Sequence, residues 1–140
     1  MEALKQASLT VPVVLHAWSG SAEMVQAISK STARAFFSLS GAITSMKAQR
    51  ALSIIRAIPD DQLLLESDAP DGHLRLDRDW LEQLGLAELK LALPGSQDEP
   101  NTPTCLTATL QIVAAARGQS PEHVARTTAR NASSAFGLIP

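Results

Sequence analysis

Two short apolar segments of the chain end in polar residues that could bind a metal ion. His16 follows the segment 11–15, and Glu66 and Asp68 follow the segment 63–65. Neutral imidazole and carboxylate groups are ordinary ligands of zinc and similar divalent ions. Such an ion can polarise a phosphoryl or carbonyl oxygen and activate water for hydrolysis. If His16 and Asp68 lie together, the sequence therefore predicts a metal site.

These residues also have a purely structural interpretation. A histidine after a strand is more often a surface group than a ligand, and an aspartate there is often a turn former or a helix cap. A catalytic zinc site normally has three protein ligands, whereas His16 and Asp68 supply two. Both interpretations stay open on position alone.

The order of elements is what would bring the two residues together. Apolar segments 11–15, 35–39 and 63–65 are typical of buried strands, and helical patterns at 22–28 and 47–58 separate them. Alternating strands and helices favour a parallel sheet, hence an α/β fold. The carboxyl ends of parallel strands share one edge of the sheet, where active sites lie. His16, Ser40, Glu66 and Asp68 are predicted at that edge.

The second half of the chain is predicted to be mainly helical after an irregular connection over 71–102. A short helix is expected over 77–84, ending at Gly85. Thr102 and Pro103 open a later helix that stops at Gly118. Ser120 and Pro121 open the next, and Gly137 closes the last one.

Composition excludes several classes of protein. The 140 residues carry 12 Lys plus Arg against 14 Asp plus Glu, and 45% are hydrophobic. A chain of this kind can bury a core, so it is neither disordered nor a histone-like basic protein. Cys105 is alone, and no segment is typical of a signal peptide or a membrane span. An intracellular location, the cytoplasm above all, and no membrane partner are expected.

Five segments, in order, resemble the TatD family of metal-dependent deoxyribonucleases. They are 15–21 (LHAWSGS), 37–41 (FSLSG), 63–70 (LLLESDAP), 101–103 (NTP) and 130–131 (RN), with Phe136-Gly137 following. The third is similar to the family's most recognisable signature, in which Thr usually stands at the position of Ser67.

The resemblance implies a (β/α)8 barrel of the amidohydrolase-like kind with divalent metals (Mg, Mn or Zn) at its mouth. His16 would match a metal ligand after the sixth strand. Asp68 would match the carboxylate after the eighth, which binds metal and helps to activate the attacking water. Glu66, Ser67 and Asn101 would support the site, Glu66 from deeper on the same side as Asp68.

The chain departs from the family pattern in its missing ligands. It has three histidines, His16, His73 and His123, and no His-x-His pair. A full barrel needs about 250 residues, so residues 1–140 are expected to form a C-terminal portion, with the last three βα units and 1–10 as the remnant of a preceding helix. His73 is expected to be an exposed loop residue. Side chains expected to lose packing partners in such a partial barrel include Val13, Leu15, Phe36 and Leu64.

The predicted function is that of a metal-dependent hydrolase that cleaves phosphodiester bonds, with DNA as a substrate. A partner chain or a missing N-terminal segment would complete the barrel, and a targeting segment could precede it. One alternative is a catalytically inactive fragment or interaction module that keeps the barrel signature. Another is an amidohydrolase-like enzyme for a small substrate, because fold alone does not fix function.

Overall fold

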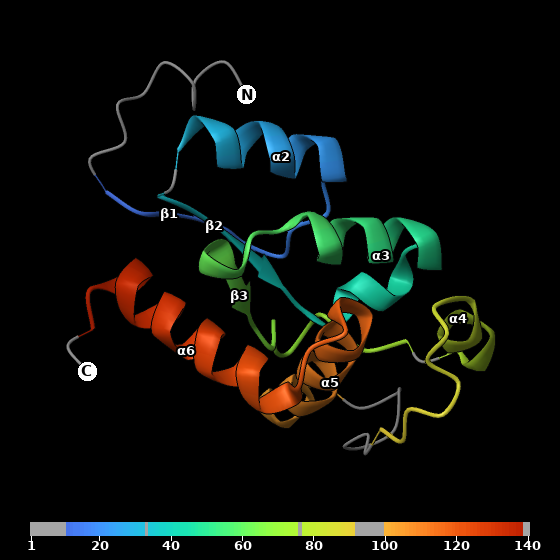
Figure 1. The fold of residues 1–140 in the computed structure, drawn as a ribbon. Helices are drawn as coiled ribbons and strands as arrows, with labels where there is room; N and C mark the ends of the chain where they lie inside the picture. Colours follow the sequence, from blue (N-terminus) through green and yellow to red (C-terminus); the bar gives the residue numbers. More distant parts are fainter. Residues whose placement is uncertain (1–10, 33, 76, 92–99, 139–140) are drawn as a thin grey trace.

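The computed structural model describes residues 11–32, 34–75, 77–91 and 100–138. Its strands and helices alternate through the first half of the chain, and helices dominate the second half (Figure 1). In chain order the elements are β1 (Val13–Leu15), α2 (Ala22–Ser31), β2 (Ala35–Leu39), the 3-10 helix η1 (Gly41–Ser45), α3 (Ala48–Ala57), the 3-10 helix η2 (Asp60–Gln62), β3 (Leu63–Leu65), α4 (Arg78–Gln83), the 3-10 helix η3 (Pro103–Cys105), α5 (Leu106–Arg117) and α6 (Pro121–Phe136).

The three strands form one parallel sheet in the order β1-β2-β3. Val13 pairs with Ala35, and Phe37 pairs with Leu63. The predicted α/β class and the strands at 35–39 and 63–65 are confirmed. The first strand is shorter than expected and begins at Val13, whose N–H donates to Arg34. Pro12 has no N–H to offer a ladder, and Val11 is exposed.

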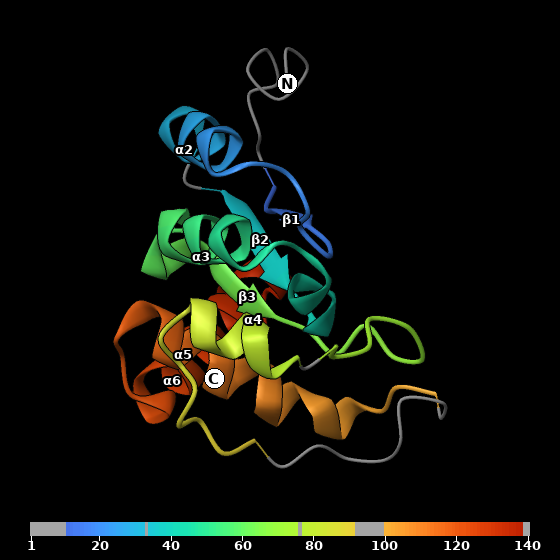
Figure 2. The ribbon, with the colours of Figure 1, turned by 90° about the vertical axis from the view of Figure 1, so that its right-hand side faces the viewer.

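The core lies between the sheet and its helices. Phe37 and Leu39 from the middle strand and Leu63 from β3 are almost wholly buried, as are Ile54 and Ile55 of α3. Helix α3 packs against α2 on one side and α5 on the other, and α6 packs along β3 (Figure 2). Burial of this apolar surface is the main force that holds the strand ends in place.

Two of the side chains expected to lose partners are buried instead. Phe36 is 5% exposed and Leu64 is 4% exposed, whereas Val13 and Leu15 are half-buried. Phe36 lies on β2, which has a strand on each side. Leu64 shares an apolar cavity with Leu110 of α5 and Ala129 of α6. The expectation was wrong for both residues, and for Leu64 the reason is that the C-terminal helices cover β3.

Hydrogen bonds tie these helices to the start of β3. The Asn131 side chain donates to the carbonyl oxygens of Asp60 (2.7 Å) and Leu63 (2.8 Å). Arg117 donates to the carbonyl oxygens of Ile55 (2.6 Å) and Ile58 (2.9 Å), and it pairs with the Asp60 carboxylate. Buried carbonyls need such donors. The resulting network fixes where β3 begins and therefore where Glu66 and Asp68 emerge.

The predicted helix boundaries are largely confirmed. Asp77 and Ser120 cap α4 and α6, and Gly118 and Gly137 end α5 and α6 in the left-handed conformation. Of the connection 71–102, residues 76 and 92–99 lie outside the described part, as does the expected helix remnant at 1–10. No helix among the described residues is long and apolar enough to cross a bilayer.

Candidate metal site

His16 is placed by a sharp turn after β1. Ala17 has a positive φ of 42°, which turns the chain away from the strand direction. The N–H of Trp18 then donates to the carbonyl oxygen of Ser38 on the neighbouring strand (2.9 Å). The Trp18 ring packs edge-on against Phe37, and it occupies the space that a Cβ at Gly20 would need. The aromatic ring and the glycine thus hold the turn that carries His16.

Helix α3 braces this turn from outside. Arg50 donates from its guanidinium to the carbonyl oxygen of Ser19 (2.9 Å). In the structure it fixes the backbone of the turn after His16.

Glu66 connects the ends of β1 and β3. Its N–H continues the sheet by donating to Leu39 (3.0 Å). Its carboxylate accepts a hydrogen bond from the N–H of Ala17 (2.8 Å), and His16 Nδ1 lies 2.9 Å from each carboxylate oxygen. One carboxylate therefore holds both the backbone after β1 and the imidazole of His16.

Asp68 faces the other nitrogen of the same ring. Its Oδ1 lies 3.2 Å from His16 Nε2. Asp68 has a positive φ of 55°, a conformation that aspartate tolerates better than most residues. Gly72, at a φ of 66°, lies directly against it, because a Cβ at Gly72 would come within 2.6 Å of Asp68 Cβ. The loop is thus folded tightly around Asp68.

Asn101 supports that loop from the far end of the connection. Its side-chain nitrogen donates to the carbonyl oxygens of Ser67 (2.7 Å) and Asp71. Its backbone N–H donates to Pro70 (2.9 Å). Ser67 contributes its carbonyl to this bracing, and its hydroxyl oxygen accepts a longer bond from the N–H of Ala69 (3.4 Å). Hydrogen bonds and close contacts therefore connect His16, Glu66, Ser67, Asp68 and Asn101 at one edge of the sheet.

The electrostatics of the site centre on His16. Its hydrogen bond with Glu66 and the charge of that carboxylate raise the pKa of His16 above its ordinary value, and Asp68 adds to the effect. The side chain of His16 is 66% exposed, against 20% for Glu66 and 23% for Asp68. The imidazole is thus accessible from solvent while its two acidic partners lie half-buried behind it.

The donor set fits a divalent metal in chemistry and spacing. Each of His16, Glu66 and Asp68 offers a ligand atom within 4.8 Å of the others. Two ligands of one zinc ion, at bond lengths near 2.1 Å, lie about 3.4 Å apart in tetrahedral geometry. The 3.2 Å between His16 Nε2 and Asp68 Oδ1 is close to that value. Because Glu66 holds Nδ1, these two atoms are the natural donors of the group.

Two residues that shape the site from below, Gly72 and His73, could not be placed there from the sequence. Gly72 had no assigned role, and its signal was the Asp-Gly pair at 71–72, which is typical of a tight turn. His73 was expected to be exposed, but it is half-buried and lines a pocket near Asp68. That expectation was wrong because the loop 71–75 packs against η1.

A family model described as "TatD related DNase" matches residues 1–137. The chain belongs to the TatD family. This confirms the resemblance drawn from the five sequence segments, including those that carry His16, Glu66 and Asp68. A comparison with curated proteins gave no match.

Solved structures similar to this TatD-family chain share its fold. They include an uncharacterised amidohydrolase from Saccharomyces cerevisiae (18% identity, TM-score 0.68) and a TatD homologue from Escherichia coli (23%, 0.66). A hydrolase of the TatD family from Entamoeba histolytica is similar at 17% identity and a TM-score of 0.67. The matches cover 89%, 90% and 87% of this chain but 40%, 40% and 41% of those structures. The chain thus spans about two fifths of their length and is a partial (β/α)8 barrel.

Proposed function

We propose that this chain forms part of a metal-dependent hydrolase that cleaves phosphodiester bonds, with DNA as its substrate. The observation that carries the proposal is the convergence of His16 Nε2 and Asp68 Oδ1, 3.2 Å apart, at the carboxyl edge of the sheet. Family membership adds the class of reaction, since the matching family model is described as "TatD related DNase".

Within this proposal, Glu66 prepares His16 for metal binding. A carboxylate on Nδ1 favours the tautomer with the proton on that nitrogen, which leaves the Nε2 lone pair free. It also raises the basicity of the ring, as partners of metal-binding histidines commonly do. The bond from Ala17 to the same carboxylate keeps the ring and the strand end in register.

Asp68 has two tasks in the proposed reaction. One carboxylate oxygen would bind the divalent ion with His16 Nε2, and the carboxylate would take a proton from the attacking water. When bound, the ion would supply the positive charge that polarises the phosphoryl oxygen. Ser67, Gly72 and Asn101 hold Asp68 for these tasks through the contacts of its loop.

The described residues bring two such donors to this point, so further ligands would come from elsewhere. A partner chain or an N-terminal segment that completes the barrel would supply them. A catalytically inactive fragment is the second candidate function, and the share of the related structures that this chain spans favours it. Metal binding and cleavage, both measured on the chain itself, separate the two.

The test is cleavage of labelled DNA by the purified chain with Mg²⁺, Mn²⁺ or Zn²⁺. Asp68→Asn is expected to lower the rate by about 100-fold or more, as is typical when a general base is removed. Asp79→Asn is the matched control, because Asp79 is exposed in the first turn of α4. Metal-dependent cleavage that survives in Asp68→Asn contradicts the proposed role of Asp68. If the unsubstituted chain binds no divalent metal and cleaves no DNA, the proposed function fails for this chain and the inactive fragment stands.

A further inference from the structure

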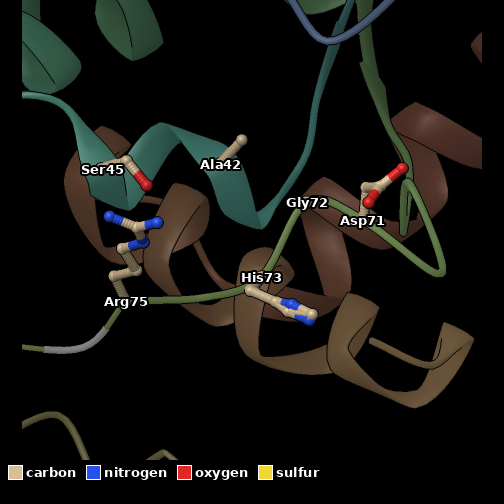
Figure 3. Close-up of a pocket in the computed structure, with 6 residues that line it drawn as sticks. All are labelled: Ala42, Ser45, Asp71, Gly72, His73 and Arg75. Atoms are coloured by element: carbon tan, nitrogen blue, oxygen red, sulfur yellow. The ribbon is translucent and has the colours of Figure 1, made fainter. Parts of the chain in front are cut away.

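A polar pocket of about 270 Å³ lies beside the candidate metal site (Figure 3). Two loops that follow neighbouring strands form it, η1 after β2 and the loop 71–75 after β3. We call it the Arg75 pocket, and its lining residues are Ala42, Ser45, Asp71, Gly72, His73 and Arg75.

Hydrogen bonds between the two loops hold the pocket in shape. The buried hydroxyl of Thr44 donates to the carbonyl oxygen of Gly41 (2.7 Å) and accepts from the N–H of Arg75 (2.7 Å). Gly41 lies so close to the carbonyl oxygen of Gly72 that no Cβ fits between them. On the far side, Asn101 holds the carbonyl of Asp71. The pocket is therefore a fixed feature of the fold.

The pocket and the metal site share a wall. Gly72 lines the pocket, and the same residue lies against the side chain of Asp68. A Cβ at Gly72 would come within 2.9 Å of Asp68 Oδ2. A group held in the pocket would thus lie next to a group held at Asp68.

The chemistry of the pocket suits an oxyanion. Figure 3 shows the guanidinium of Arg75 at one end with the hydroxyl of Ser45, and the carboxylate of Asp71 at the other end. Arg75 is exposed, and its side chain has no carboxylate partner among the residues that the structure describes. A guanidinium offers several donors in a planar fork that matches phosphate oxygens. An unpaired arginine beside a hydroxyl donor is thus well suited to bind one.

We propose that the Arg75 pocket binds a phosphate group of the substrate next to the one that is hydrolysed, through Arg75 and Ser45. This subsite rests on the proposed function, because it assigns a place to the neighbouring phosphate of a phosphodiester chain. It goes beyond that function in naming a recognition element on the loop 71–75.

The test is binding of inorganic phosphate and of a 5′-phosphorylated thymidine dinucleotide to the full chain, measured by calorimetry with EDTA present. Chelation removes metal-mediated binding, so the subsite is measured apart from the metal site. Arg75→Gln is expected to weaken binding of both probes by about tenfold or more, the usual effect of losing a charge-assisted contact. Arg78→Gln is the matched control, since Arg78 is exposed on α4 and pairs with Glu82. It should leave binding within about twofold.

Equal dissociation constants for Arg75→Gln and Arg78→Gln would overturn the subsite. It would also be overturned if the probes bound only with Mn²⁺ present and lost affinity in His16→Ala but not in Arg75→Gln. That second result would leave the proposed function intact. Conversely, loss of binding in Arg75→Gln together with no metal-dependent cleavage would support the subsite and contradict the proposed function.

Discussion

Replacing Glu66 by glutamine tests how the site prepares His16 for a metal. The carboxylate accepts from Ala17 N–H at 2.8 Å and lies 2.9 Å from His16 Nδ1 through either oxygen. Glutamine has one acceptor oxygen and one NH2 group. If the oxygen serves Ala17, the NH2 group faces Nδ1 and donates to it. The imidazole proton then moves to Nε2, the nitrogen that faces Asp68.

The size of the effect follows from that change of tautomer. A protonated Nε2 cannot bind a metal until the proton is displaced. Loss of the group that orients a metal-binding histidine typically weakens metal affinity by about 10- to 100-fold. That range corresponds to about 1.4–2.7 kcal/mol of binding free energy. Glu66→Gln is therefore expected to raise the dissociation constant for Zn²⁺ or Mn²⁺ by this factor.

Calorimetry with Zn²⁺ and Mn²⁺ measures the affinity, and the nitrogen chemical shifts of His16 report the tautomer. Glu82→Gln is the control, because Glu82 undergoes the same chemical change on the exposed side of α4. Glu66→Gln with wild-type affinity and the proton still on Nδ1 would refute the role assigned to Glu66. A loss of affinity without a change of tautomer would refute its mechanism.

Three further substitutions test the supports of the site. Gly72→Ala places a Cβ within 2.6 Å of Asp68 and should weaken metal binding. Gly85→Ala is the control, because Gly85 has the same left-handed backbone but open space around it, so the substitution should lower only the stability, by about 1–2 kcal/mol. Equal metal affinity of the two variants would contradict the packing of Gly72 against Asp68. Asn131→Ala leaves two carbonyl oxygens without their hydrogen-bond donor. It should lower the free energy of unfolding, measured in urea, by about 2–4 kcal/mol. The control Arg130→Ala, at an exposed neighbour, should lower it by about 0.5 kcal/mol or less. Burial raises the pKa of Asp60, but hydrogen bonds from Gln119 and Arg117 and the charge of Arg117 outweigh it, so the pKa is lowered. A lowered pKa stabilises the fold above the ordinary carboxyl pKa near 4 and loses that stabilisation as the pH falls through the folded value. Acid unfolding curves of Asp60→Asn should accordingly depend less on pH below about 5, and an unchanged dependence would exclude Asp60 as a contributor.

The strand ends could be predicted from sequence because each depends on local pattern. Short apolar segments closed by polar and glycine residues fixed β2 and β3, and alternation with helices fixed their parallel order. From that order alone, His16 and Asp68 had to share an edge of the sheet. The order of the strands says nothing of the distance between the two residues, however. Only the structure shows that Glu66 lies at Nδ1 of His16 and Asp68 at Nε2.

What could not be predicted depends on contacts between distant segments. Gly72 lies under Asp68 because two left-handed residues fold one loop back on itself. Leu64 is buried because α5 and α6 pack over β3, and no local pattern encodes that. The role of Arg75 likewise depends on η1, which lies some 30 residues earlier in the chain. Periodicity gives elements, whereas these features depend on how the elements pack.

Whether His16 and Asp68 share a metal ion is tested most directly by following the ring nitrogens of His16 by NMR while Zn²⁺ is added to the chain. We expect the Nε2 signal to shift on binding while Nδ1 keeps its proton against Glu66. Asp68→Asn should abolish the shift or weaken binding by about tenfold or more. If the chemical shifts of His16 did not change with Zn²⁺, or changed equally in the unsubstituted chain and in Asp68→Asn, the two residues would not share a metal ion.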